Sequence, residues 1–190
     1  MTSRNLIITV LVLAVILGGA YFAFSKYLVS RLDGTGGVSA APSAQIETYA
    51  PNGFGLSFDY AADRYDTQLL AQDGAQVVAL LPEGYQPVEN GEGPPSIALW
   101  SAPIAEGVSL ADWVRSDSRS NFALSSDGVL TPVVVGGEPA VAYRHSGLYE
   151  TDAVALLRGG QVYVFTAGWA KDTDPIRTDF QDLLATIRFN

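Results

Sequence analysis

The pattern of apolar and polar positions divides the chain into an uncharged apolar run, a polar connector and a long stretch of short alternating segments. Residues 6–24 carry no charge. As a helix rising about 1.5 Å per residue, this run spans roughly 28 Å, close to a bilayer core of about 30 Å. We therefore expect a short cytoplasmic head over 1–5 and a transmembrane helix over 6–24. A juxtamembrane segment and flexible linker over 25–48 and a globular domain over 49–190 follow.

A cleaved signal peptide is the competing interpretation of residues 6–24. Gly18-Gly19-Ala20 offers small residues at a cleavage position. Cleavage there would leave Tyr-Phe-Ala-Phe at the new terminus, and the run exceeds the usual length of a signal-peptide core. We favour an uncleaved, single-pass signal-anchor in the cell membrane.

The orientation of this anchor follows from the size of what flanks it. A head of five residues before a large acidic domain favours a cytoplasmic N-terminus and an extracytoplasmic domain. Lys26 and Arg31 lie on the far side and do not support this orientation by the positive-inside rule. Ala14 with Gly18 has a small-residue spacing that packs helices together, which leaves a homodimer open.

Short runs of alternating or β-branched residues predict strands in the domain. These runs are 56–60, 76–81, 96–100, 131–135, 139–145, 153–158 and 161–167. Gly136-Gly137 and Gly159-Gly160 separate the last four runs into two pairs. Paired glycines supply the positive φ angles of two-residue hairpin turns, so we expect an antiparallel meander over 130–167.

Two segments with helix signals interrupt the strands. Ser109 can cap a helix over 110–114, with Trp113 facing the core. Asp174 and Pro175 have the residue types of an N-cap and a first helical position. The apolar stripe that follows consists of Ile176, Phe180, Leu183, Leu184 and Ile187. The predicted fold class is α+β, an antiparallel sheet flanked by helices.

Four stretches of the domain share their pattern and order with one known family. They are Gly53-Phe-Gly-Leu-Ser-Phe-Asp-Tyr60, Ser109-Leu-Ala-Asp-Trp-Val114, Val135-Gly-Gly-Glu-Pro-Ala-Val-Ala-Tyr143 and Phe180-Gln-Asp-Leu-Leu-Ala-Thr-Ile-Arg-Phe189. With these motifs the chain resembles the PsbP-like domain family, in particular its anchored bacterial members. Ala61 stands where a proline is common. The resemblance implies an α/β/α sandwich but no single role, because members range from photosystem II accessory subunits to a nuclear Ran-binding protein.

Charge and composition remove several classes of function. The chain has a net charge of −9, and from Tyr49 onward 18 Asp or Glu stand against 8 Lys or Arg. Such a surface repels phosphate backbones, so we expect no nucleic-acid partner. The absence of cysteine excludes disulfides, thiolate catalysis and Cys-ligated metals. A solubilising surface is the simplest reading of the excess acid.

Candidate chemistry in the domain is sparse. His145 is the only histidine, and it shares a strand face with Val141 and Tyr143. No catalytic motif surrounds it, so a partly buried strand histidine is the more common reading. The acidic clusters lack the spacing of a calcium loop. We therefore predict no catalytic residue, no metal ligand and no cofactor.

Trp169 and Asp172 lie between the last predicted strand and the last helix. An exposed loop tryptophan is typical of an interface, whereas packing over the sheet edge is the more common alternative. The candidates for partner or ligand contact are Trp169, Asp172 and His145. We expect a membrane-tethered, extracytoplasmic, non-enzymatic accessory or interaction module with a protein partner. The alternative is an extracytoplasmic domain that binds a small ligand or a cation.

Overall fold

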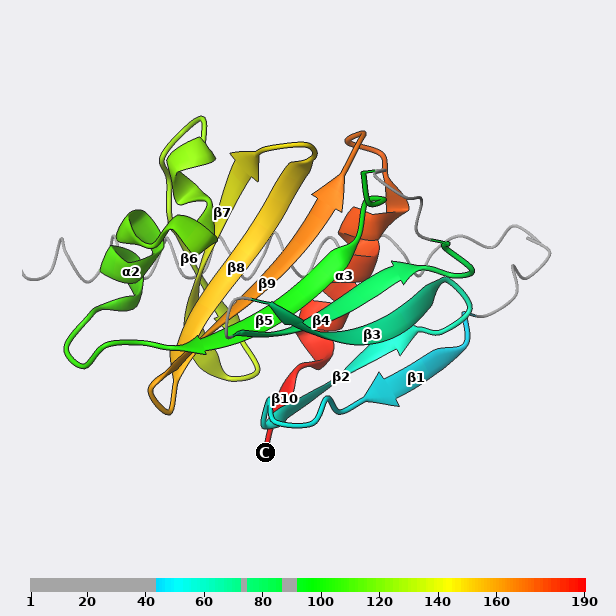
Figure 1. The fold of residues 1–190 in the computed structure, drawn as a ribbon, viewed down its shortest axis with the longest axis horizontal. Helices are drawn as coiled ribbons and strands as arrows, with labels where there is room; N and C mark the ends of the chain where they lie inside the picture. The colour runs from blue at the N-terminus through cyan, green and yellow to red at the C-terminus, as the bar shows by residue number, and fades with distance from the viewer. Residues whose placement is uncertain (1–43, 73–74, 87–91) are drawn as a thin grey trace, which may run out of the picture. The chain divides into compact units, whose positions relative to one another are not determined.

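The central element of the structure, a computed structural model, is an antiparallel sheet of seven strands (Figure 1). Residues 44–72, 75–86 and 92–190 are described. In spatial order the strands are β3 (Tyr65–Gln72), β4 (Ala75–Pro82), β5 (Ile97–Pro103), β9 (Gln161–Trp169), β8 (Glu150–Arg158), β7 (Glu138–Ser146) and β6 (Thr131–Val135). The predicted meander over β6 to β9 is confirmed. Gly136 and Gly159 open its two tight turns with a φ of 58° each.

A second, smaller sheet has the order β1-β2-β10. Its strands are β1 (Ile46–Tyr49), β2 (Leu56–Ala61) and β10 (Arg188–Phe189). The folded unit begins at Ala44, whereas the predicted linker ran to Thr48. The sequence pattern did not predict β1, because its polar sequence becomes a strand only through pairing with β2. In this pairing Thr48 Oγ1 donates a hydrogen bond to Asp59 Oδ1 at 2.7 Å.

Helical elements cover both faces of the large sheet. On one face α3 (Pro175–Thr186) packs against β9 and β2 (Figure 1). On the other face lie α2 (Leu110–Ser116) and the short 3-10 helices η1 (Ser118–Ser120) and η2 (Phe122–Leu124). The predicted α+β class, an antiparallel sheet with helices, is confirmed. Among the described residues, no helix is long and apolar enough to cross a membrane. The predicted transmembrane helix over 6–24 lies outside the described residues.

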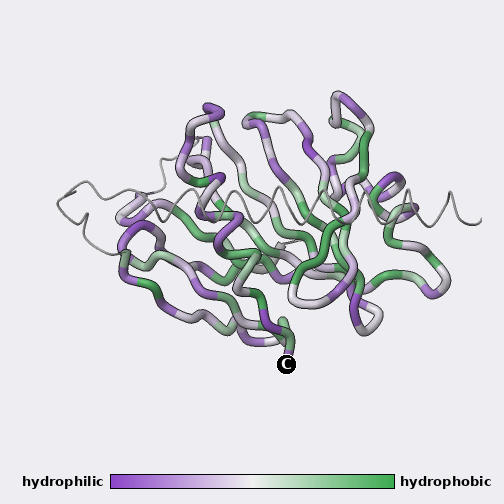
Figure 2. Tube along the Cα trace, turned by 180° about the vertical axis from the view of Figure 1, so that it is seen from behind, coloured by the Kyte–Doolittle hydropathy of each residue, from purple (hydrophilic) through white to green (hydrophobic). Residues whose placement is uncertain are grey.

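Two hydrophobic cores fill the space on either side of the sheet. The core under α3 contains Phe58, Phe165 and Phe180, each at most 1% exposed. The core under α2 contains Trp113 and Val114, as the sequence predicted for Trp113. Figure 2 shows hydrophobic residues running through the strands, while many of the turns are hydrophilic. Residues on both faces of the central strands are buried in these two cores.

Candidate functional site

The ends of β7, β8 and β9 form a corner of the sheet with a different set of side chains on each face. Arg144 lies opposite Asp152 and His145 lies opposite Thr151 in the β7–β8 ladder. Trp169 lies opposite Glu150 in the β8–β9 ladder. Because side chains alternate along a strand, the α3 face receives Arg144, Asp152 and Trp169. The α2 face receives His145 and Thr151.

The corner therefore separates the predicted contact residues. Trp169 and Asp172 lie on the α3 side, where both contact the Arg177 side chain. His145 lies on the opposite side of the same sheet. Sequence spacing could not show this, since strand register decides which face each residue takes.

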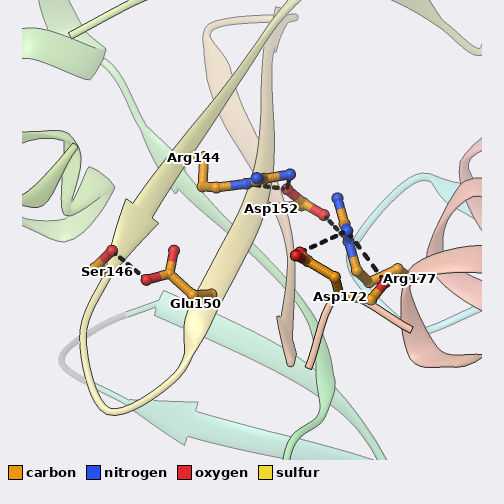
Figure 3. Close-up of polar contacts among 6 residues, drawn as sticks. All are labelled: Arg144, Ser146, Glu150, Asp152, Asp172 and Arg177. Atoms are coloured by element: carbon orange, nitrogen blue, oxygen red, sulfur yellow. Dashed lines mark hydrogen bonds and ion pairs between the residues drawn. The ribbon is translucent and has the colours of Figure 1, made fainter. Parts of the chain in front are cut away.

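On the α3 side two guanidinium groups lie over the Trp169 ring. The Cζ atoms of Arg144 and Arg177 lie 5.1 and 4.4 Å from its centroid. Asp152 joins the two arginines, with Oδ1 2.8 Å from Arg144 Nη2 and Oδ2 2.8 Å from Arg177 Nε (Figure 3). We call Arg144, Trp169, Arg177 and Asp152 the arginine–tryptophan stack. A cation over an indole face is attracted to it, and a shared carboxylate holds both cations in place.

The structure decides between the two alternatives for Trp169. The residue is the last of β9 and is 5% exposed, so it is packed and does not stand free in a loop. Its indole Nε1 is buried without a hydrogen-bond partner among the described residues. Asp172, by contrast, has an 81% exposed side chain at the rim of the stack, 3.4 Å from Arg177 Nη1.

A groove of about 360 Å³ lies beside the stack, between α3 and the strands β6 to β8. Arg144, Asp152 and Arg177 line one part of it. Leu184 and Ala142 contribute half-buried apolar surface. The groove exists because α3 crosses β9 and leaves the neighbouring β7–β6 surface without a helix above it.

The α2 side of the corner holds a second cavity, of about 260 Å³, which we call the His145 pocket. Its lining residues are Ser96, Trp100, Arg119, Ser120, Asn121, His145, Tyr149, Thr151, Thr166 and Gly168. They come from β5 and the residue before it, from β7, β8 and the turn between them, from β9 and from the η1–η2 segment. The pocket is thus assembled from strand ends that are distant in sequence.

His145 is 7% exposed, and its Nδ1 atom is buried without a hydrogen-bond partner in the described chain. Burial lowers the pKa of its imidazole, and the Glu150 carboxylate partly offsets this effect. The imidazole is therefore uncharged at neutral pH. The predicted partly buried strand histidine is confirmed, next to Tyr143 on the same strand face.

Arg119 forms one wall of the pocket. Its Nε donates to Asp117 Oδ1 at 2.9 Å and its Nη2 to Asp117 Oδ2 at 2.7 Å. Its Cζ lies 5.6 Å from the Trp100 ring centroid. Hydrogen bonding to Arg119 lowers the pKa of the Asp117 carboxyl, so this pair carries no net charge. Asn121 follows in the left-handed region, with φ of 55°, which turns the chain at the pocket rim.

Sequence reasoning identified His145 but missed the other polar residues of the pocket. Thr151 could have been found from the β7–β8 hairpin register. Arg119 and Thr166 had no such signal, because they are 47 positions apart and meet only across the β5–β9–β8–β7 order. Within residues 44–72, 75–86 and 92–190, no group of three His, Cys, Asp or Glu side chains is placed to hold a metal ion.

Comparison with solved structures identifies the fold. The solution structure of cyanobacterial PsbP (CyanoP) from Synechocystis sp. PCC 6803 matches with a TM-score of 0.53 at 14% identity, over 82% of this chain and 99% of that one. A crystal structure from Bacteroides thetaiotaomicron VPI-5482 aligns with a TM-score of 0.47 at 9% identity, over 76% of this chain and 48% of that one. No protein-family model and no curated protein matches the sequence. The CyanoP match confirms that the domain has a PsbP-like fold.

Proposed function

We propose that this protein is a membrane-tethered accessory module whose PsbP-like domain acts outside the cytoplasm by binding a protein partner, without catalysing a reaction. The observation that carries the proposal is the open groove beside the arginine–tryptophan stack. The tether is the apolar segment over 6–24, and residues 25–43 link it to the folded unit that begins at Ala44.

The groove has the features of a docking surface for a protein segment. Val129 is 51% exposed at its edge, and Leu184 is half-buried in its wall, so apolar surface is available to a partner. The side chain of Arg144 is 45% exposed although its Cζ lies 5.1 Å from the Trp169 centroid. A guanidinium held by stacking and an ion pair loses little further freedom when it binds. A partner segment with an apolar side chain and a carboxylate would complement this surface.

Photo-crosslinking in native membranes tests the proposal. We expect a photoreactive residue at Gln181, which is exposed and lines the groove, to give a discrete crosslinked product in the full-length protein. The same residue at Asp63, exposed in the turn after β2, is the matched control and should give none. Arg144→Glu should abolish the Gln181 product while the protein stays folded. Identical products from both positions, or none from Gln181, would reject the groove as the binding surface.

A small-ligand-binding function is the second candidate, and the buried, unpartnered Nδ1 of His145 favours it. A cation is the least suitable ligand, because none of the described residues that line the His145 pocket is Asp or Glu.

A further inference from the structure

We propose that the His145 pocket binds one small, uncharged molecule with several hydroxyl groups, of the sugar or polyol class. The proposal deepens the second candidate function and is independent of the protein-docking groove, because the two cavities lie on opposite faces of the sheet. The proposal is argued from four features of the pocket. They are its size, the charge of its walls, the hydrogen-bonding groups of its walls and the unpartnered imidazole nitrogen.

The size of the pocket limits the ligand to one small unit. Its volume of about 260 Å³ lies below the range of about 300–1,000 Å³ that is typical of sites for drug-sized molecules. Strands β5, β7, β8 and β9 supply half of the lining residues, and the other half come from Ser96, the η1–η2 segment and the β7–β8 turn.

The charge of the walls selects against an ion. Arg119 is the only lining residue that is charged at neutral pH among those described, and Asp117 occupies two of its nitrogen atoms. His145 stays uncharged, because burial disfavours its protonated form. A charged ligand would give up its hydration without finding an unmatched opposite charge. An anion would also approach the Asp117 carboxylate.

The hydrogen-bonding groups of the pocket both donate and accept. Thr151 and Thr166 carry hydroxyls whose bonds to the carbonyl oxygens of Tyr149 and Ala98 are long, at 3.4 Å each. Ser96 adds a further hydroxyl. Ligand hydroxyls also donate and accept, so they can match such a mixed set, whereas a ligand with acceptors alone would leave protein acceptors unpaired.

The imidazole of His145 independently indicates that a ligand or a water molecule binds at this site, because its Nδ1 atom lacks a hydrogen-bond partner among the described residues. Buried polar atoms nearly always have a hydrogen-bond partner, and an orphaned one in a native structure calls for an explanation. Nδ1 belongs to a residue that is 7% exposed and lines the cavity, but the atom itself is buried, so the ring has to turn before Nδ1 faces the cavity. A ligand hydroxyl or a water molecule can supply the missing partner after a small adjustment of the ring, and the experiment distinguishes the two.

The test uses the fact that His145 is the only histidine of the chain. Full-length protein without an affinity tag is labelled with ¹⁵N-histidine, so one imidazole reports on the pocket by NMR. The probes are glucose, galactose, mannose and myo-inositol, with sodium phosphate, sodium acetate and calcium chloride as charged competitors. We expect a saturable shift of the imidazole signals with at least one neutral probe and none with the charged compounds.

Matched variants show whether the shift arises from binding in the pocket. Thr151→Val keeps the shape of the side chain and removes its hydroxyl, and should weaken binding by about tenfold. Thr131→Val makes the same change in the groove on the other face and should leave binding unchanged. Both variants should keep the melting temperature of the wild type.

Three results would overturn the proposal. They are saturation only with phosphate, acetate or calcium, a neutral-probe shift that persists unweakened in Thr151→Val, and no saturable shift with any neutral probe. The last result would assign the orphaned nitrogen to a buried water molecule. The crosslink from Gln181 reports on the other face, so failure here and failure of the docking groove are distinguishable.

Discussion

At the scale of single residues, the corner of the sheet shows how environment sets the chemistry of a side chain. Trp169 has lost its solvent exposure but contacts two cations, which keeps it part of a charged surface. His145 is buried against Tyr143 and is uncharged for that reason. Both residues were identified from their type and position, and each has the packed environment that was the more common of its two sequence-based readings.

His145 should make the stability of the domain depend on pH. Burial lowers its folded-state pKa below the ordinary value of about 6.5, so the unfolded chain binds its proton first as pH falls. The unfolded state is thereby favoured, and the free energy of unfolding should decrease as pH falls through about 6.5 towards the folded-state pKa. Urea denaturation at about pH 7.5 and 5.5 measures the decrease.

His145→Gln is the control for this effect, because it keeps a polar side chain that does not titrate. Carboxylates titrate alike in both proteins, so the variant should show the smaller loss of stability on acidification. Equal losses in the wild type and the variant would show that the imidazole does not contribute.

Asp152 should be the most sensitive member of the arginine–tryptophan stack. Asp152→Asn leaves Arg144 and Arg177 next to each other without their shared anion. We expect a loss of about 1–2 kcal/mol in the free energy of unfolding, measured by urea denaturation. Asp172→Asn, with its 81% exposed side chain, should cost less than about 0.5 kcal/mol. A comparable cost at both positions would mean that Asp152 does not organise the stack.

At the scale of elements, local signals and distant pairing contribute to different parts of the fold. α3 follows its local signals: Asp174 Oδ1 accepts a hydrogen bond from the backbone N–H of Ile176, and Pro175 is the first helical residue. The sequence pattern did not predict the strands β1, β3 and β10. β1 and β10 are very short, and all three depend on pairing with neighbouring strands. A polar stretch such as β1 forms a strand when a neighbouring edge pairs with it.

The turn between β6 and β7 should be intolerant of a side chain for two reasons. Gly136 has φ of 58°, and a Cβ atom there would lie 2.8 Å from the Phe189 ring. Gly159 has the same φ and open space around it, so Gly159→Ala measures the backbone strain alone, about 1 kcal/mol. Gly136→Ala should cost a further amount of about 1–2 kcal/mol from overpacking. Equal costs in thermal or urea unfolding would contradict a close contact with β10.

At the scale of the whole molecule, excess negative charge remains after internal pairing. Six arginines form ion pairs in the described domain, each with an Asp or Glu. Their positive charges are therefore largely neutralised within the domain. The net charge of −9 is consequently borne by carboxylates in excess of these pairs, as expected for a solubilising surface.

The proposed membrane topology can be tested with a single thiol, because the sequence has no cysteine. Glu106→Cys places it at an exposed position in the turn between β5 and α2. A membrane-impermeant maleimide should label the full-length band on intact cells. A shorter labelled band would identify residues 6–24 as a cleaved signal peptide. Labelling only after lysis would place the domain in the cytoplasm and contradict the proposed location.

The sequence by itself determined what depends on neighbouring residues. The paired glycines defined both hairpins of the meander, since few residues other than glycine adopt their positive φ angles readily. The Asp174-Pro175 start and the apolar period of the last helix defined α3. Alternation along β7 placed His145 on the face of Tyr143. Together these local patterns were enough for the α+β class and the PsbP-like resemblance.

Tertiary structure decided everything that depends on which strands lie side by side. The ladder between β5 and β9 joins Ile97 to Ala167 across 70 positions, and no local pattern encodes that register. This ladder and the one between β9 and β8 bring Thr166 to the pocket of His145 and place Trp169 next to two arginines on the opposite face. Side-chain direction alternates at every residue, so both candidate sites exist only once the order and register of the strands are set.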